Sequence, residues 1–159
     1  MKRSPLTDEA NVWVFARDFL HGYMPKTRGL APPTIQAYRI SLECFLDFLT
    51  THHHLHRFEV TFTHFTREYL KGWLNWMNTE QGYAPKTVML RLAAIKAFLA
   101  YSAAEDISLI ALHQAAQTLK APRPPRVPIE YLTPEATRAV LAAHTGATSK
   151  SRRNRMLLI

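Results

Sequence analysis

Cysteine and acidic residues are scarce in this chain of 159 residues. Cys44 is the only cysteine, which excludes an intramolecular disulfide framework and a cysteine-rich zinc site. Every uninterrupted apolar run is far shorter than the roughly 18–20 residues that a membrane span requires. Asp8, Glu9, Arg17 and Asp18 place charges near the N-terminus, where a secretory signal would need an apolar stretch. We therefore expect a soluble, cytoplasmic protein without a membrane partner.

Positive charge is the feature that is present in excess. The formal net charge is +8, and the isoelectric point is near 9.9. Residues 1–119 carry a net charge of +2, whereas residues 120–159 carry +6. An excess of this kind predicts a polyanionic partner, most often nucleic acid. The balanced first part is typical of a globular domain, and the second part is typical of a basic arm.

The boundary between these parts is rich in proline. Residues 120–128 contain four prolines and three cations. Proline lacks a backbone donor and biases its neighbours toward extended conformations, so this stretch predicts a semi-rigid linker. The expected organisation is a helical domain over 1–119, a basic linker over 120–130 and the start of a further domain over 131–159.

The apolar spacing before the linker predicts an all-α fold, a small bundle of four to five helices. The expected helices cover residues 8–23, 32–50, 66–79, 85–103 and 109–118, and the tail adds 133–143 and a start near 151. Thr7 is the expected N-cap of the first helix, which Gly22 and Pro25 should end. The stretch 52–63 is β-rich in composition but too short to make a sheet. The expected apolar face of the fourth helix is Val88, Leu92, Ile95, Phe98 and Leu99, and the expected core tryptophans are Trp13, Trp73 and Trp76.

Two of these helices begin alike. Residues 30–49 and 83–102 align without gaps, sharing Ala-Pro, Thr and Phe-Leu at five matching positions. Two amphipathic helices with one start signal would produce the same likeness without a true repeat, so both explanations stay open. Proline in the first turn favours the start of a helix and should leave backbone N–H groups pointing forward as an anion site.

These residues carry a resemblance. The stretches 30–49 and 83–101 resemble the DNA-facing helices of the core-binding, or SAM-like, domain of tyrosine recombinases of the phage-integrase type. Residues 119–128 are similar to the linker of that family, and 131–143 to the first helix of its catalytic domain. The resemblance implies the DNA-binding part of a site-specific recombinase that takes part in DNA integration or recombination, as mobile elements encode. It also implies double-stranded DNA and other recombinase protomers as partners.

The resemblance also bears on catalysis. In that family, a helix like the one expected near residue 151 leads to a Gly-x-Arg turn that carries the first catalytic arginine. This chain stops at Ile159, so the catalytic arginines, lysine, histidine and nucleophilic tyrosine would all lie further downstream. Strand cleavage needs that nucleophile and those cations. We expect the chain to be inactive in cleavage, with no catalytic residue, no cofactor and no small-molecule substrate.

The fourth predicted helix supplies the first DNA-binding candidates. Lys86 and Thr87 stand in its first turn, where contact with a phosphate is natural. Lys86 and Lys96 are expected opposite the apolar face, with Ala93 between them allowing close approach to a groove. Arg91 falls at the edge of the apolar face, so a contact with the DNA backbone and a purely structural role remain equally open.

The second predicted helix and the linker supply the remaining candidates. Gln36 and Arg39 have side chains that can read base edges, although one sequence does not specify which bases. An extended linker has no hydrophobic core in which its cations could have a structural role, so we expect them to contact phosphates. These candidates are Thr34, Gln36, Arg39, Lys120, Arg123 and Arg126.

Other reactive residue types have simpler explanations. His52, His53, His54 and His56 lie close together, but no cysteine stands near them, and we expect an exposed segment after a helix and no metal site. Cys44 is expected to be a small buried residue. The tyrosines are expected to pack or face solvent and not to act as nucleophiles; they are Tyr38, Tyr69, Tyr83, Tyr101 and Tyr131.

Three classes of function remain open. The first is the DNA-binding half of a site-specific recombinase. The second is a stand-alone DNA-binding protein from a truncated mobile-element gene, which would occupy sites without cutting them. The third is a helical protein-interaction module whose basic tail is incidental. The linker and the order of the motifs favour the first class over the third.

Overall fold

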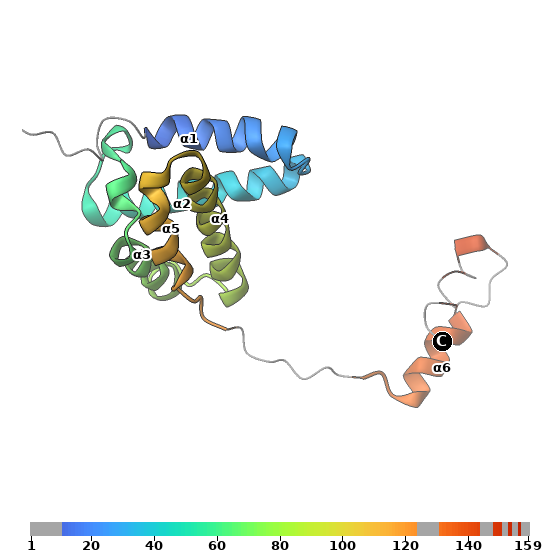
Figure 1. Cartoon of the computed structure of the whole chain (residues 1–159). Coiled ribbons are helices and arrows are strands. Elements are labelled where there is room, and N and C mark those ends of the chain that lie inside the picture. The colour runs from blue at the N-terminus through green and yellow to red at the C-terminus, as the bar shows by residue number, and fades with distance from the viewer. Residues whose placement is uncertain (1–10, 124–130, 144–147, 151–152, 154–155, 157–159) are drawn as a thin grey trace, which may run out of the picture. The chain divides into compact units, whose positions relative to one another are not determined.

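The computed structural model describes residues 11–123, 131–143, 148–150, 153 and 156. The regular structure in this part of the chain is helical and includes no strand, which confirms the all-α prediction (Figure 1). By their internal contacts, the residues divide into two units, Met1–Pro124 and Pro125–Ile159. All elements from α1 to α5 belong to the first unit.

The first helix is longer and more irregular than predicted. α1 covers Val12–Asp18 and continues directly into a π-helical segment, η1, over Phe19–Thr27. Asn11 caps α1 by accepting a hydrogen bond from the Trp13 N–H, whereas the predicted cap Thr7 lies outside the described residues. The expected end at Gly22 and Pro25 is wrong, because Pro25 lies inside η1. The wider hydrogen-bond spacing of a π-helix tolerates the missing proline donor.

The remaining helices of the first unit lie close to their predicted ranges. α2 covers Pro32–His53, α3 covers Arg67–Thr79, α4 covers Pro85–Glu105 and α5 covers Ile110–Gln117. Short 3₁₀ turns connect them: η2 over Arg57–Glu59, η3 over Phe62–His64 and η4 over Ile107–Leu109. The β-rich stretch after α2 therefore forms two turns and no sheet, as expected.

Aromatic rings fill the core of this unit. Phe45 and Trp73 are fully buried with ring centroids 5.3 Å apart, and Phe98 lies 5.8 Å from Phe65. Trp73 and Trp76 are buried as predicted. The same prediction is wrong for Trp13, which is 37% exposed because Val12 takes the inward position in that turn of α1.

α4 is the central helix of the bundle. By length and composition alone it would suffice to cross a membrane. Its predicted apolar face is confirmed as buried and packs in contact with α2, α3 and α5. This position at the centre of a helical core accounts for its apolar character.

The second unit contains α6, over Pro134–Ala143. Thr133 precedes it and accepts a hydrogen bond from the Ala136 N–H at 3.2 Å. Val140 and Leu141 are half-buried, while Met156 is 79% exposed. The helix expected from residue 151 onward falls mostly outside the described residues.

The sequence likeness of the two helix starts is also a likeness of backbone geometry. Gly29 before α2 has φ +60°, and Gly82 before α4 has φ +59°. In both places the N–H of the residue after the glycine donates to a carbonyl of the preceding helix. Leu30 donates to Met24 and Tyr83 donates to Met77, each at 3.0 Å. Each bond spans six residues and closes the helix end around a glycine with positive φ, a conformation that favours glycine.

The likeness continues into the following helices. Ala31 and Ala84 are both extended N-caps, each followed by proline. The carbonyl of each alanine accepts the N–H groups three and four residues later. All these contacts recur at a spacing of 53 residues. The chain thus contains two helical hairpins, η1 with α2 and α3 with α4, whose junctions have the same backbone geometry.

Candidate nucleic-acid interface

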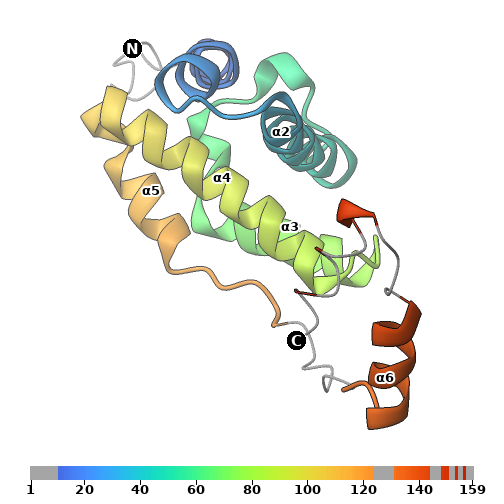
Figure 2. The ribbon, with the colours of Figure 1, turned by 90° about the vertical axis from the view of Figure 1, so that its right-hand side faces the viewer.

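α2 and α4 carry seven of the ten predicted DNA-binding residues. In Figure 2, α2 is seen nearly along its axis while α4 lies across the view, so the two helices cross at a steep angle. Thr34 and Gln36 on α2 and Lys86 on α4 are exposed, whereas Thr87 is half-buried. The first turns of α2 and α4 thus both reach the surface. Because the two helices cross at a steep angle, their candidate residues do not form one row.

The two helix starts differ in what they offer an anion. Pro32 and Pro33 have no N–H, and the Thr34 N–H donates to the Ala31 carbonyl at 3.0 Å. The Ile35 N–H donates to the same carbonyl at 3.2 Å. The expectation that both starts leave N–H groups for an anion is therefore wrong for α2.

The start of α4 keeps one such group. Pro85 lacks an N–H, while Thr87 and Val88 donate to the Ala84 carbonyl at 2.8 and 3.1 Å. The Lys86 N–H belongs to the orphan donors of the first helical turn, and its ammonium stands on the same residue. Lys86 therefore combines a backbone donor and a positive charge at one exposed helix end.

Two predicted arginines have partners within the protein. Arg39 is half-buried, and its Nη2 lies 3.2 Å from His21 Nε2. The Cζ atom of Arg91 lies 4.2 Å from the ring centroid of Tyr83, a cation–π contact that links α4 to the turn before it. Both side chains are oriented by these contacts, and each guanidinium retains further N–H donors.

Lys96 does not have the position predicted for it. Its ammonium donates to the Leu119 carbonyl at 2.7 Å and approaches the Gln117 carbonyl at 3.4 Å. Gln117 is the last residue of α5 and Leu119 follows it, so the ammonium lies at the C-terminal end of the helix, where positive charge is favourable. Burial lowers the pKa of Lys96 from its ordinary value. The wheel geometry of α4 was insufficient to predict this, because the partner carbonyls come from a different element.

The linker candidates are partly described. Lys120 and Arg123 are exposed directly after the segment that Lys96 holds. Arg126 lies outside the described residues. The Pro-rich stretch therefore begins at a fixed point on the first unit.

A hollow between α2 and α4 contains two carboxylates. It is lined by Glu43 and Asp47 of α2, facing Arg91 and Tyr83, and has a volume of about 340 Å³. Asp47 also accepts a hydrogen bond from Arg57 at 3.2 Å. Cys44 borders the hollow and is buried, as predicted. Carboxylates here would repel a phosphate, so this part of the surface is a poor place for the DNA backbone.

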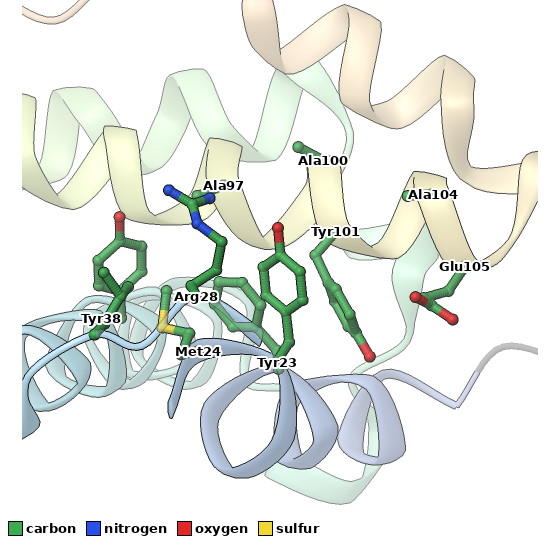
Figure 3. A pocket seen from close by; sticks show the side chains of 11 residues that line it. Tyr23, Met24, Arg28, Tyr38, Ala97, Ala100, Tyr101, Ala104 and Glu105 are labelled. Atoms are coloured by element: carbon green, nitrogen blue, oxygen red, sulfur yellow. The ribbon is translucent and has the colours of Figure 1, made fainter. Parts of the chain in front are cut away.

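An aromatic cavity of about 260 Å³ lies between η1 and the C-terminal half of α4 (Figure 3). The rings of Tyr23 and Tyr101 line it and pack against each other at a tilt, with centroids 4.9 Å apart. A hydrogen bond from Arg28 to Tyr23 raises the pKa of Arg28, and burial raises the pKa of Tyr101. These tyrosines pack η1 against α4, in agreement with the expectation that Tyr101 is a packing residue.

The four histidines are exposed as expected, but His52 and His53 belong to the last turn of α2 and only His54 and His56 follow it. His52 Nε2 lies 3.1 Å from a Glu80 carboxylate oxygen, and His54 ends α2 with φ 53°. His56 and Glu59 form the reciprocal cap of η2. Burial, followed by the neighbouring histidines, lowers the pKa of His53. Among the described residues, no group of three or more ligands is placed to hold a metal ion.

A comparison with protein families gives one match. The model of the phage integrase, N-terminal SAM-like domain, matches residues 18–106. This range runs from the end of α1 through η1, α2, α3 and α4, and it covers more than half of the chain. No curated protein and no solved structure matches the chain.

Proposed function

The chain belongs to the family of phage integrase N-terminal SAM-like domains, and on that premise we propose that it is the DNA-binding part of a site-specific recombinase. The observation that carries this proposal is the family match over residues 18–106. The net charge of +8 supports it, because duplex DNA is the polyanion that such a domain meets. Its role is to hold one face of the duplex during integration or recombination.

The start of α4 is the first contact in this proposal. The Lys86 ammonium and N–H point to the same phosphate, and Thr87 beside them can add a hydroxyl donor. Ala93 is exposed two helical turns further along the same face and leaves room for a groove edge. On α2, exposed Gln36 reads a base edge while Thr34 contacts the backbone.

Arg39 and Arg91 are the second set of contacts, and Arg91 is the weaker of the two because it lines the hollow whose carboxylates repel a phosphate. Their partners, His21 and Tyr83, pre-orient the guanidinium groups, which lowers the entropy lost when a phosphate binds. Lys96 acts indirectly, by holding the segment after α5. Lys120, Arg123 and Arg126 then contact phosphates from the linker and complete a clamp, and other protomers bind the same DNA.

A salt titration tests the proposal. The whole chain is titrated with a fluorescent duplex between 50 and 200 mM salt, followed by anisotropy. Each neutralised phosphate lowers log K by about 0.9 per decade of salt, so five to eight contacts cost roughly 10³–10⁴ in affinity over this range. Absence of binding at 50 mM, or binding indifferent to salt, contradicts the proposal and favours a protein-interaction module.

The Lys86→Gln variant locates the binding surface. We expect weaker binding and a salt slope lower by about 0.9, with an unchanged melting temperature because Lys86 is exposed. Lys26→Gln is the matched control, since it removes one exposed lysine from the end of η1. Equal binding by both variants would show that the start of α4 does not contact DNA.

A further inference from the structure

A groove lies between α3 and the segment that follows α5. Its volume is about 440 Å³. Of the predicted DNA-binding residues, it includes only Lys120. Its cations are Arg67, Lys71 and Lys120, and its lining includes no carboxylate; the other lining residues are Leu74, Asn75, Asn78, Thr118, Leu119, Ala121 and Pro122.

The α3 wall of this groove presents polar donors in a row. Arg67, Lys71, Asn75 and Asn78 follow one another at intervals of four, four and three residues, so they share one face of the helix. All four are exposed. At 1.5 Å per residue the row is about 16 Å long, the axial length of about five phosphates in one strand of B-DNA.

Hydrogen bonds hold the opposite wall in place. Arg67 Nε donates to Thr118 Oγ1 at 3.1 Å, and Thr118 Oγ1 donates to the Ala115 carbonyl at 2.7 Å. Lys96 fixes the Leu119 carbonyl from the α4 side. The groove is therefore set before any ligand arrives, and binding would cost little ordering of its walls.

Charge identifies the kind of ligand. The hollow between α2 and α4 contains Glu43 and Asp47, whereas this groove combines three cations with two side-chain amides. The row of donors about 16 Å long and the absence of carboxylates from the lining together fit a chain of phosphates. α3 as a whole does carry a carboxylate, that of Glu68, but Glu68 does not line the groove. The absence of negative charge is therefore a property of the groove and not of the whole helix.

We propose that this groove binds the sugar–phosphate backbone of DNA as a contact additional to the surface of α2 and α4. This inference rests on the proposed function, because it assigns a second part of the same DNA to the chain. Lys71 and Lys120 neutralise phosphates, and Asn75 and Asn78 donate hydrogen bonds to neighbouring phosphate oxygens. Arg67 retains its terminal nitrogens for the same purpose while its Nε holds Thr118.

Two charge changes in the groove test the inference in the whole chain. Lys71→Gln removes one cation, and its control Arg57→Gln removes an exposed cation that is paired with Asp47 elsewhere. Asn78→Asp adds a carboxylate to the groove, and its control Gln114→Glu adds one at an exposed position of α5. Each variant is titrated with the same labelled duplex at 50 and 200 mM salt, and its melting temperature is recorded.

We expect Lys71→Gln to bind more weakly at 50 mM salt and to lower the salt slope by about 0.9, so the loss between 50 and 200 mM shrinks by about 3.5-fold. Asn78→Asp should weaken binding more than Gln114→Glu does. If the groove variants match their controls while the parent binds with a steep salt slope, the inference is overturned and the proposed function stands. If the parent does not bind at 50 mM, both are overturned.

Discussion

The starts of α2 and α4 have the same backbone and different chemistry. Each follows a left-handed glycine and an extended alanine. The same backbone hydrogen bonds form at both starts, at positions 53 residues apart. At the second position of the helix, however, α2 has Pro33 and α4 has Lys86. One substitution thus removes both the backbone donor and the charge from α2. The comparison teaches that two helix starts can have the same junction geometry while only one of them has the features of an anion site.

The largest effect should come from the repeated phenylalanine of the two hairpins. Phe45 and Phe98 occupy equivalent positions and are both fully buried. We expect Phe45→Ala and Phe98→Ala each to lower the free energy of unfolding by about 3–5 kcal/mol. Urea unfolding measures this. A much smaller cost for one of them would mean that the two hairpins do not contribute alike to the core.

The next effect distinguishes the two lysines of α4. Lys96→Met keeps the apolar stem but loses the bonds to the carbonyls after α5, so we expect a loss of about 1–2 kcal/mol. Lys86→Met, at an exposed helix end, should stay within about 0.5 kcal/mol of the parent. Thermal unfolding of both variants checks the contrast. Equal stabilities would show that Lys96 does not hold the end of α5.

The two junction glycines should respond equally. A Cβ added at Gly29 or Gly82 meets no atom within 4 Å, so only the positive φ opposes it. We expect Gly29→Ala and Gly82→Ala each to cost about 1 kcal/mol. Gly22→Ala is the matched control, because it is equally open but lies inside η1 without a positive φ. Urea unfolding measures the loss of unfolding free energy in each variant. Different losses for Gly29→Ala and Gly82→Ala would show that the two junctions are not equivalent.

Exchanging the residues at positions 33 and 86 compares the two helix starts in DNA binding. Pro33→Lys should give α2 the donor and charge of α4, raising the salt slope of DNA binding by about 0.9. Lys86→Pro should lower it by the same amount, because the α4 start then resembles that of α2. Anisotropy titrations against the parent measure both. If Pro33→Lys leaves the slope unchanged, the start of α2 lies away from the DNA backbone.

The smallest effect concerns pH at the end of α2. The folded protein lowers the pKa of His53, so the unfolded chain takes up a proton first as pH falls. Stability should therefore decline as pH falls from above the unfolded pKa of about 6.5 through the lower folded value. His53→Gln should flatten this part of the profile. Melting temperatures measured from pH 8 to pH 5 test it, and an identical profile in the variant would rule out a contribution from His53.

Local signals predicted most of the fold. Prolines at the starts of α2 and α4 and the apolar spacing of Val88, Leu92 and Phe98 are properties of neighbouring residues, so the ranges and the buried face followed from the sequence. Pro25 misled the prediction because a π-helical turn accommodates it. Whether a ring such as Trp13 turns inward depends on the elements packed beside it, which the sequence does not show.

The interface was predictable only in part, for the same reason. Lys86 is exposed at a helix start, and a local pattern suffices to find it. Lys96 differs because its partner carbonyl at Leu119 is 23 residues away and belongs to another element. The α3 groove also needed tertiary structure: Arg67 and Lys71 look like an ordinary solvated face until the segment after α5 lies opposite them.

The bond from Lys96 to the Leu119 carbonyl ties one wall of the α3 groove to the central helix of the bundle. A displacement of α4 would therefore be transmitted to residues 118–122, and a pull on those residues would be transmitted to α4. The lysine thus acts as a mechanical link between two surfaces of the first unit, without touching DNA itself.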